Sequence, residues 1–381
     1  MAVNRERLAA NFTELCEIDS PSRREGRISQ RLQQIFRELG ALEILEDDSS
    51  SCTGSECGNL IIRFAGDLDL APIFFSCHMD TVQPAEGVRV KRVGDLFTSA
   101  GDTILGSDDK SGIAACIEAM RLLGETGQPH RPVEFVITTC EEIGLVGAKA
   151  LDPHLVQARE GYALDSSGFA RVITHAPAAN RLTITVNGIA AHAGLHPEWG
   201  VSALILAAQA LARVPAGRID EETTANFGTI SGGAASNIVP EQVVIEGEVR
   251  SHSEEKLARV TEEIRNIFNR TVAAWTDPSG SAKGTPSVQV EVRQDFPLMR
   301  LSTEDQVLRR VEAAARTIGM ALTYERAGGG SDANIFNGHG LATAIIATGM
   351  TNVHSTREQV ELQDMVDLTR LLLALMTETS C

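Results

Sequence analysis

The stretch Ile73-Phe-Phe-Ser-Cys-His78-Met-Asp80 is a short apolar run that ends in an imidazole and a carboxylate. Residues 60–64 and 133–138 form similar runs rich in Val, Ile and Phe, and a helical pattern at 111–123 precedes the last of them. Strands that are apolar on both faces are typical of parallel sheets covered by helices. This part of the chain therefore predicts an α/β domain with a mixed, largely parallel sheet.

The two ends of the chain have the same character. Apolar side chains at helical spacing predict one helical segment from residue 5 to residue 39, ended by Gly40. Its apolar face consists of Leu8, Phe12, Leu15, Ile28, Leu32, Ile35 and Phe36. Residues 341–347 predict a further buried strand, and residues 361–376 predict a helix. We expect both ends to belong to the α/β domain.

The middle of the chain has a different pattern. Residues 181–187 alternate strictly, which predicts a strand with one exposed face. A helix (202–214), two strands (226–231 and 242–250), a second helix and a third alternating stretch follow. The second helix places Leu257, Val260, Ile264 and Ile267 together, and the last strand carries Val288, Val290 and Val292. The order β-α-β-β-α-β predicts a ferredoxin-like α+β domain at 178–296, inserted between residues 1–177 and 297–381.

Composition excludes several classes of partner. The chain has 381 residues and a formal net charge of −17, so we expect neither nucleic acid nor an anionic membrane as a partner. No apolar run approaches the roughly 18 residues that span a bilayer, and the first residues lack the apolar stretch of a secretory leader. The seven cysteines, an odd number, predict a reduced protein in the cytoplasm. Cys52 and Cys57 could pair or bind a metal, but no second couple completes a zinc site.

Acidic and imidazole side chains follow the predicted strands. Alternation places His78 and Asp80 on one side, where the carboxylate could orient the imidazole; a purely structural pair is the alternative. Asp108 and Asp109 lie at the start of a predicted helix. An acidic residue there can be a helix N-cap, for which one residue is enough, but a carboxylate can also bridge two cations. Glu141 and Glu142 belong either to a solvated loop or to a site where one binds a metal and the other is a general base.

Two further residues complete the pattern. Asp165 and His354 each follow an apolar run, and either would be an ordinary loop residue by itself. Ligands of open α/β sheets bind beyond the carboxyl ends of the strands. Two histidines and three carboxylates at that edge could hold two zinc-like ions that share one carboxylate, with a water left as nucleophile.

With these residues the chain resembles the co-catalytic dizinc metallopeptidases, a family that includes peptidase T, glutamate carboxypeptidase, aminoacylase and succinyl-diaminopimelate desuccinylase. It is most similar to peptidase T and its relatives, over nearly the whole chain. The motifs, in order, are His78-Met-Asp80, Gly106-Ser-Asp108-Asp109-Lys110-Ser-Gly112, Glu141-Glu142-Ile-Gly144, Leu164-Asp165, Gly188-Ile-Ala-Ala-His192-Ala-Gly194 and Val353-His354.

The resemblance implies roles for the clustered residues. One zinc would bind His78, Asp108 and Asp165, and the second would bind Asp108, Glu142 and His354. Asp80 would orient His78. Glu141 would be the general base that takes a proton from the metal-bridging water, so that a hydroxide attacks, and would return it to the leaving amine. In this family an Asp at the position of Asp165 accompanies aminopeptidases.

The resemblance also implies that the inserted domain is a lid that forms a homodimer. His192 would reach the partner subunit's site and stabilise the tetrahedral oxyanion; the alternative is a solvated loop histidine. Asn237 and Arg250 resemble substrate clamps, although Arg250 could equally be a strand-end surface residue. Gly330 and Ser331 belong to Gly328-Gly-Gly-Ser331-Asp332, which lacks the context of a dinucleotide motif and is similar to a turn whose backbone N–H groups face the site.

We therefore expect a cytoplasmic, homodimeric exopeptidase of the peptidase T type that removes the N-terminal residue of short peptides such as tripeptides. The expected cofactors are two divalent ions, Zn²⁺ first and Co²⁺ or Mn²⁺ as alternatives. Two other functions stay open: an N-acyl amino-acid amidohydrolase or carboxypeptidase of the same family, and a catalytically silent binding homologue.

Overall fold

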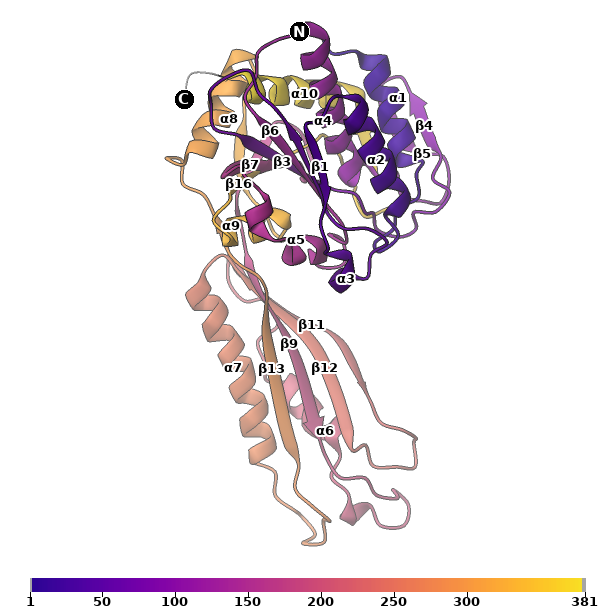
Figure 1. Ribbon diagram of the computed structural model, residues 1–381. Coiled ribbons are helices and arrows are strands. Elements are labelled where there is room, and N and C mark those ends of the chain that lie inside the picture. The colour runs from indigo at the N-terminus through magenta and orange to yellow at the C-terminus, as the bar shows by residue number, and fades with distance from the viewer. Residues whose placement is uncertain (1, 379–381) are drawn as a thin grey trace. The chain divides into compact units, whose positions relative to one another are not determined.

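The computed structural model describes residues 2–378, and the chain divides into two compact units (Figure 1). The first unit runs to Ala176 and resumes at Met299. The second unit is Pro177–Leu298. Each unit has its own apolar core, so each is described by itself.

The first unit is built on a mixed sheet in the order β1-β2-β6-β3-β7-β16-β8-β14, with β15 also paired to β8. The neighbours β6, β3, β7 and β16 are parallel, and antiparallel strands flank them. The strands are β1 (Glu43–Glu46), β2 (Leu60–Phe64), β3 (Ile73–His78), β6 (Val133–Thr138), β7 (Glu160–Ala163), β8 (Arg171–Ala176), β14 (Met299–Arg300), β15 (Thr323–Arg326) and β16 (Ala342–Ile346). The mixed α/β fold with a largely parallel central sheet is confirmed.

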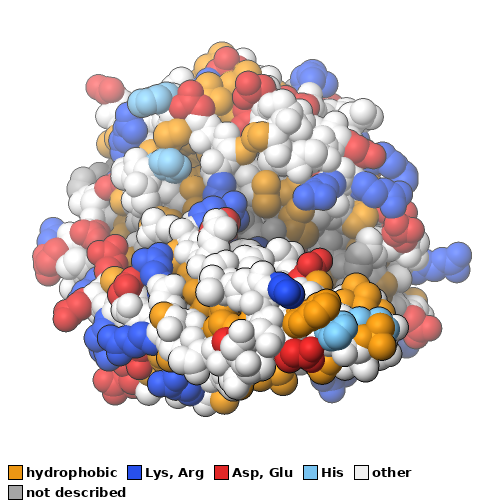
Figure 2. All heavy atoms as spheres, turned by 90° about the horizontal axis from the view of Figure 1, so that it is seen from below, with side chains coloured by type: hydrophobic (Ala, Val, Ile, Leu, Met, Phe, Trp, Pro, Cys, Tyr) orange, Lys and Arg blue, Asp and Glu red, His pale blue; other side chains and the backbone are white. Residues whose placement is uncertain are grey.

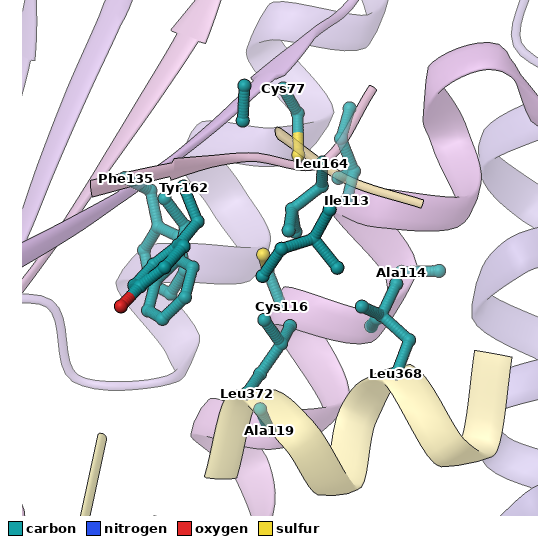
Figure 3. Packing of buried hydrophobic residues seen from close by; sticks show 14 of the residues in the cluster. Cys77, Ile113, Ala114, Cys116, Ala119, Phe135, Tyr162, Leu164, Leu368 and Leu372 are labelled. Carbon is teal, nitrogen blue, oxygen red and sulfur yellow. The ribbon is translucent and has the colours of Figure 1, made fainter. Parts of the chain in front are cut away.

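The central helix α4 (Ser107–Thr126) packs between β3 and the helices α1 (Arg5–Cys16) and α10 (Leu362–Thr377). Figure 3 shows Cys116 and Ala119 of α4 beside Leu372 of α10. A Cβ added at Gly112 would lie 2.9 Å from Leu164 Cβ and 3.1 Å from Cys77 Sγ. Gly112 therefore lets the first turns of α4 approach the sheet closely.

The remaining elements of this unit are shorter or lie farther from the central strands. They are α2 (Gly26–Glu38), α3 (Ser50–Thr53), α5 (Val146–Ala150), α8 (Gln306–Thr317), α9 (Asp332–Gly338), and a small sheet of β17 (Gln359–Glu361), β5 (Leu96–Ser99) and β4 (Val90–Val93).

The prediction of a single helical segment over residues 5–39 is wrong. The structure has two helices, α1 and α2, separated by residues 17–25. Pro21 has no N–H group to donate to a helical hydrogen bond. The Ser20 carbonyl oxygen beside it accepts the Thr81 N–H at 3.0 Å. The break places the segment 20–25 beside the end of β3.

The second unit has the order β9 (Ala178–Asn187), α6 (Ala203–Leu211), β10 (Gly217–Arg218), β11 (Thr223–Gly232), β12 (Gln242–Ser251), α7 (Glu254–Ala273) and β13 (Ser287–Phe296). Its antiparallel sheet has the order β10-β11-β12-β9-β13, and both helices share one core with it. Apart from the short β10, this is a ferredoxin-like arrangement. The helical face differs by one position, because Phe268 is buried where Ile267 was expected.

Three further observations concern membrane-spanning helices, surface charge and the cysteines. Within residues 2–378, we find no helix whose length and hydropathy would let it cross a membrane. Figure 2 shows acidic and basic side chains mixed around the edge of the face seen from below. The cysteines from Cys16 to Cys140 are all free thiols, and Cys381 lies outside the described residues.

Candidate metal centre

The carboxyl ends of the central parallel strands bring together the five residues expected to bind metal. His78 is the last residue of β3, and Asp108 lies in the first turn of α4. Glu142 follows β6, Asp165 follows β7, and His354 lies in the loop after β16. Parallel neighbours end at the same edge of a sheet, so segments far apart in sequence converge there.

Asp108 lies at the centre of this cluster. Its Oδ1 is 3.0 Å from His78 Nε2, and its Oδ2 is 3.3 Å from His354 Nε2. Each carboxylate oxygen therefore faces a different imidazole.

The other two carboxylates each lie near one of the two imidazoles. Glu142 Oε2 is 3.0 Å from His354 Nε2, and Asp165 Oδ1 is 3.9 Å from His78 Nε2. The His354 side chain is 53% exposed, whereas the other four side chains are largely buried. The cluster is thus open to solvent on the His354 side.

The buried acids carry more negative charge than two imidazoles balance. Burial and the charge of Asp108 raise the pKa of Asp165 to about 8, and burial also raises the pKa of Glu142. Hydrogen bonds to Asp108 and Glu142 raise the pKa of His354 to about 10. Glu142 Oε1 is buried with no hydrogen-bond partner in the described part of the chain. Divalent cations would supply the missing positive charge and a partner for this oxygen, so the residues fit a metal centre.

Asp80 fixes the turn that carries the two glutamates. Its Oδ1 accepts the Glu141 N–H at 2.9 Å, and its Oδ2 accepts the Glu142 N–H at 3.2 Å and the Ser22 hydroxyl at 2.6 Å. The closest acceptor for His78 Nδ1 is the Asp80 carbonyl oxygen at 3.0 Å, with the carboxylate at 3.5 Å. A proton on Nδ1 leaves Nε2 free to bind a metal.

The sequence pattern missed two buried glutamates around the cluster. Glu25 accepts the Cys140 N–H at 3.0 Å and the Ser55 hydroxyl at 2.6 Å, which holds the residue before Glu141. Glu358 accepts hydrogen bonds from the segment that carries Asp108. Neither follows a predicted strand. Cys140 lies 115 residues from Glu25 and Asp108 lies 250 residues from Glu358, so no local pattern indicates these contacts.

The segment with Gly330 and Ser331 leads into α9. Ser331 is the N-cap residue: its hydroxyl accepts the Ala333 N–H at 3.3 Å, and its own N–H donates to Asn334 Oδ1 at 3.0 Å. The next residue, Asp332, is buried and accepts the Thr138 hydroxyl at 2.5 Å on Oδ2. The two hydrogen bonds of Ser331, with Ala333 and Asn334, form a capping box at the start of α9.

The second unit holds the three other expected site residues at two separate places. His192 and Asn237 are exposed neighbours, linked by the Ala193 N–H to the Asn237 carbonyl oxygen at 2.9 Å. They lie beyond the end of the sheet where Asn187 pairs with Gln242. Arg250 pairs with Ala179 at the other end and forms an ion pair with Glu248 at 2.9 Å. Gln242 and Arg250 are about 27 Å apart along β12, so the two places lie near opposite ends of this strand.

Comparisons with known proteins agree with this architecture. The chain is 38% identical to the uncharacterized protein YqjE of Bacillus subtilis (strain 168), over 99% of this chain and 100% of that protein. The crystal structure of aminopeptidase PepT from Bacillus cereus ATCC 10987 matches with a TM-score of 0.87 and 39% identity, over 98% of both chains. A tripeptidase structure from Staphylococcus aureus subsp. aureus mu50 matches with a TM-score of 0.89 and 33% identity, over 99% of both chains.

The family model described as Peptidase family M20/M25/M40 matches residues 74–378, a range that begins within β3 and includes His78, Asp108, Glu142, Asp165 and His354. Residues 74–378 also span the whole second unit. The chain therefore belongs to the peptidase family M20/M25/M40.

Proposed function

We propose that this chain is a tripeptide aminopeptidase that uses two divalent metal ions, with Zn²⁺ as the best fit to the donors. The central observation is that the two oxygens of Asp108 face different imidazoles, at 3.0 and 3.3 Å. A carboxylate in that position suits two cations a few ångströms apart. His78 and Asp165 would complete one site, and His354 and Glu142 the other.

Glu141 is the general base of this proposal. Its carboxylate is buried beside the cluster, and the Asp80 carboxylate holds its backbone N–H. When bound, the two cations polarise the scissile carbonyl and make the attacking water more acidic. Glu141 takes a proton from that water as the water oxygen bonds to the carbonyl carbon, and gives the proton to the amide nitrogen as the C–N bond breaks. The N-terminal residue leaves as a free amino acid, and the rest of the peptide leaves with the new amine.

The specificity for a free N-terminus rests on two supports. The two solved structures at 39% and 33% identity are described as an aminopeptidase and a tripeptidase. The chain also carries Asp rather than Glu at position 165, which in the family it resembles accompanies aminopeptidases.

The second unit provides the substrate contacts and the dimer in this proposal. Arg250 would bind the peptide carboxylate in one site, whereas Asn237, which lies beside His192, would hold the peptide backbone in the site of a second copy. His192 would stabilise the oxyanion in the site of a second copy. The end of the sheet near His192 lies about 27 Å from Arg250, measured along β12 from Gln242, which supports action on different sites. A cytoplasmic location belongs to the same proposal, supported by the free thiols.

A substrate panel with metal quantification tests the function. The panel contains alanine di-, tri- and tetrapeptides and the N-acetylated tripeptide, and the same preparation is analysed for metal. We expect release of the N-terminal residue from the tripeptide, about two metal ions per chain, and loss of turnover with a chelator. Faster cleavage of the acetylated tripeptide, or turnover that survives removal of all metal, would refute the proposal.

A further inference from the structure

Glu358 is a buried carboxylate, 1% exposed, that lies four residues after His354 and is not among the proposed metal ligands. Four donors from one short segment converge on it. They are the Leu105 N–H at 2.9 Å and the Gly106 N–H at 2.8 Å on Oε2, and the Ser107 hydroxyl at 2.6 Å and the Asp108 N–H at 2.9 Å on Oε1. All four bonds span about 250 residues of sequence, so only the tertiary fold creates them.

The start of α4 needs such an acceptor from outside. The first N–H groups of a helix have no partner within it, and a Ser, Thr, Asp or Asn side chain at the N-cap usually accepts one of them. The N-cap of α4 is Gly106, which has no side chain to do this, and Asp108 has non-helical backbone angles of φ −84° and ψ 103°. Glu358 accepts the Asp108 N–H in the first turn and the Leu105 and Gly106 N–H groups just before α4, while the Asp108 carboxylate faces His78 and His354.

Glu358 also lies at the base of the loop that carries His354. Thr351 and Gln359 close this loop with reciprocal backbone hydrogen bonds of 2.8 and 3.0 Å. Within it, the Glu358 N–H donates to the Ser355 carbonyl oxygen at 3.0 Å. The exposed His354 ring thus stands on a short loop whose base is tied to the Asp108 segment through the Glu358 side chain.

We propose that Glu358 is a positioning residue that sets the spacing between Asp108 and His354 and thereby the affinity of the metal centre. This inference rests on the proposed function, because it takes Asp108 and His354 to be metal ligands. A carboxylate is required because four donors meet its two oxygens. An amide in the same place keeps only one acceptor oxygen and turns its NH₂ group toward two of the donors.

The test compares Glu358→Gln with Glu118→Gln. Glu118 is also fully buried and belongs to α4, but its partners are Arg7, at 2.8 Å through two nitrogens, and the Asn4 N–H at 3.2 Å. Metal-free parent and variant proteins are titrated with Zn²⁺ by calorimetry, and thermal unfolding is measured for each. We expect Glu358→Gln to bind Zn²⁺ about 10- to 100-fold more weakly, and Glu118→Gln to unfold at a lower temperature with the parent's Zn²⁺ affinity.

A second variant, Glu358→Asp, keeps the carboxylate one methylene shorter and should restore part of the affinity. Glu358→Asp also provides the affinity measurement if Glu358→Gln does not fold. If both Glu358 variants bind Zn²⁺ as tightly as the parent and only unfold at a lower temperature, the role of Glu358 is purely structural. This result would overturn the inference and leave the proposed function standing. A parent protein that binds no Zn²⁺ would overturn both.

Discussion

Glu141 and Glu142 follow the same strand but have different surroundings. Glu142 Oε2 is 3.0 Å from His354, whereas Glu141 lies among the charges of Asp165, His78 and Asp332. The two glutamates therefore have different roles in the proposed mechanism, and substitution can separate these roles.

Glu141→Gln and Glu142→Gln are the matched pair for this separation, since each removes one negative charge from one turn. We expect Glu141→Gln to lower kcat by about 10²- to 10⁴-fold with metal content unchanged, because a general base is lost. Glu142→Gln should reduce the metal content, because a ligand is lost. Tripeptide turnover and metal analysis of both variants check this, and an active Glu141→Gln protein would contradict the assignment.

At the level of elements, close packing of α4 on the sheet positions Asp108. A Cβ at Gly112 would come within 2.9 Å of Leu164 Cβ, whereas a Cβ at Gly124, in the same helix, would meet nothing within 4 Å. We expect Gly112→Ala to destabilise the protein by about 1–3 kcal/mol and to weaken metal binding as α4 shifts.

Gly124→Ala is the control and should stabilise the protein by about 0.5–1 kcal/mol, because alanine favours a helix over glycine. Urea unfolding of the two variants provides the measurement. Equal stability of the two alanine variants would show that α4 does not need the close approach at Gly112.

A second element, the first turn of α10, carries a half-buried acid. Burial, with repulsion from Glu361 and Asp367, raises the pKa of Asp364 to about 6. The unfolded chain has the lower, ordinary carboxyl pKa, so the folded state binds more protons between about pH 4 and pH 6, and stability falls as pH rises through this window.

Asp364→Asn removes this titration. We expect the variant to gain less than about 1 kcal/mol over the parent between about pH 4 and pH 8, since partial exposure screens the effect. Unfolding free energies of both proteins at the two pH values check the sign. A parent that loses no stability relative to Asp364→Asn over this interval would contradict the shifted pKa.

At the level of the whole molecule, a dimer with His192 acting in the partner's site makes a prediction about mixed subunits. In a heterodimer of His192→Ala and Glu141→Gln chains, one site would combine an intact Glu141 with an intact His192. The purified heterodimer should then show about half of the parent's turnover, because one of its two sites is intact, although each variant alone is nearly inactive.

The two chains are co-expressed with different affinity tags, and the doubly tagged species is assayed after sedimentation confirms its mass. No recovery in the purified heterodimer would place His192 in its own chain's site or outside catalysis. A monomer at micromolar concentration would exclude the arrangement altogether.

Local patterns in the sequence predicted much of the fold. The short apolar runs predicted β2 and β6 with the bounds that the structure has, Leu60–Phe64 and Val133–Thr138. Apolar periodicity could not show the break between α1 and α2, because both helices bury a similar face and the segment between them is held by Thr81. The polar residues at strand ends identified the cluster because parallel strands end at one edge.

By itself, the sequence determined which side chains can hold cations, since the chemistry of His, Asp and Glu and their places after buried strands are local properties. The tertiary structure decided how those side chains are held: Asp80 binds the turn at Glu141 and Glu142, Glu25 holds Cys140, and Glu358 holds the segment of Asp108. These contacts join residues 61 to 250 positions apart. Hydrogen bonds over such separations depend on the folded path of the whole chain, and no periodicity or spacing in the sequence encodes them locally.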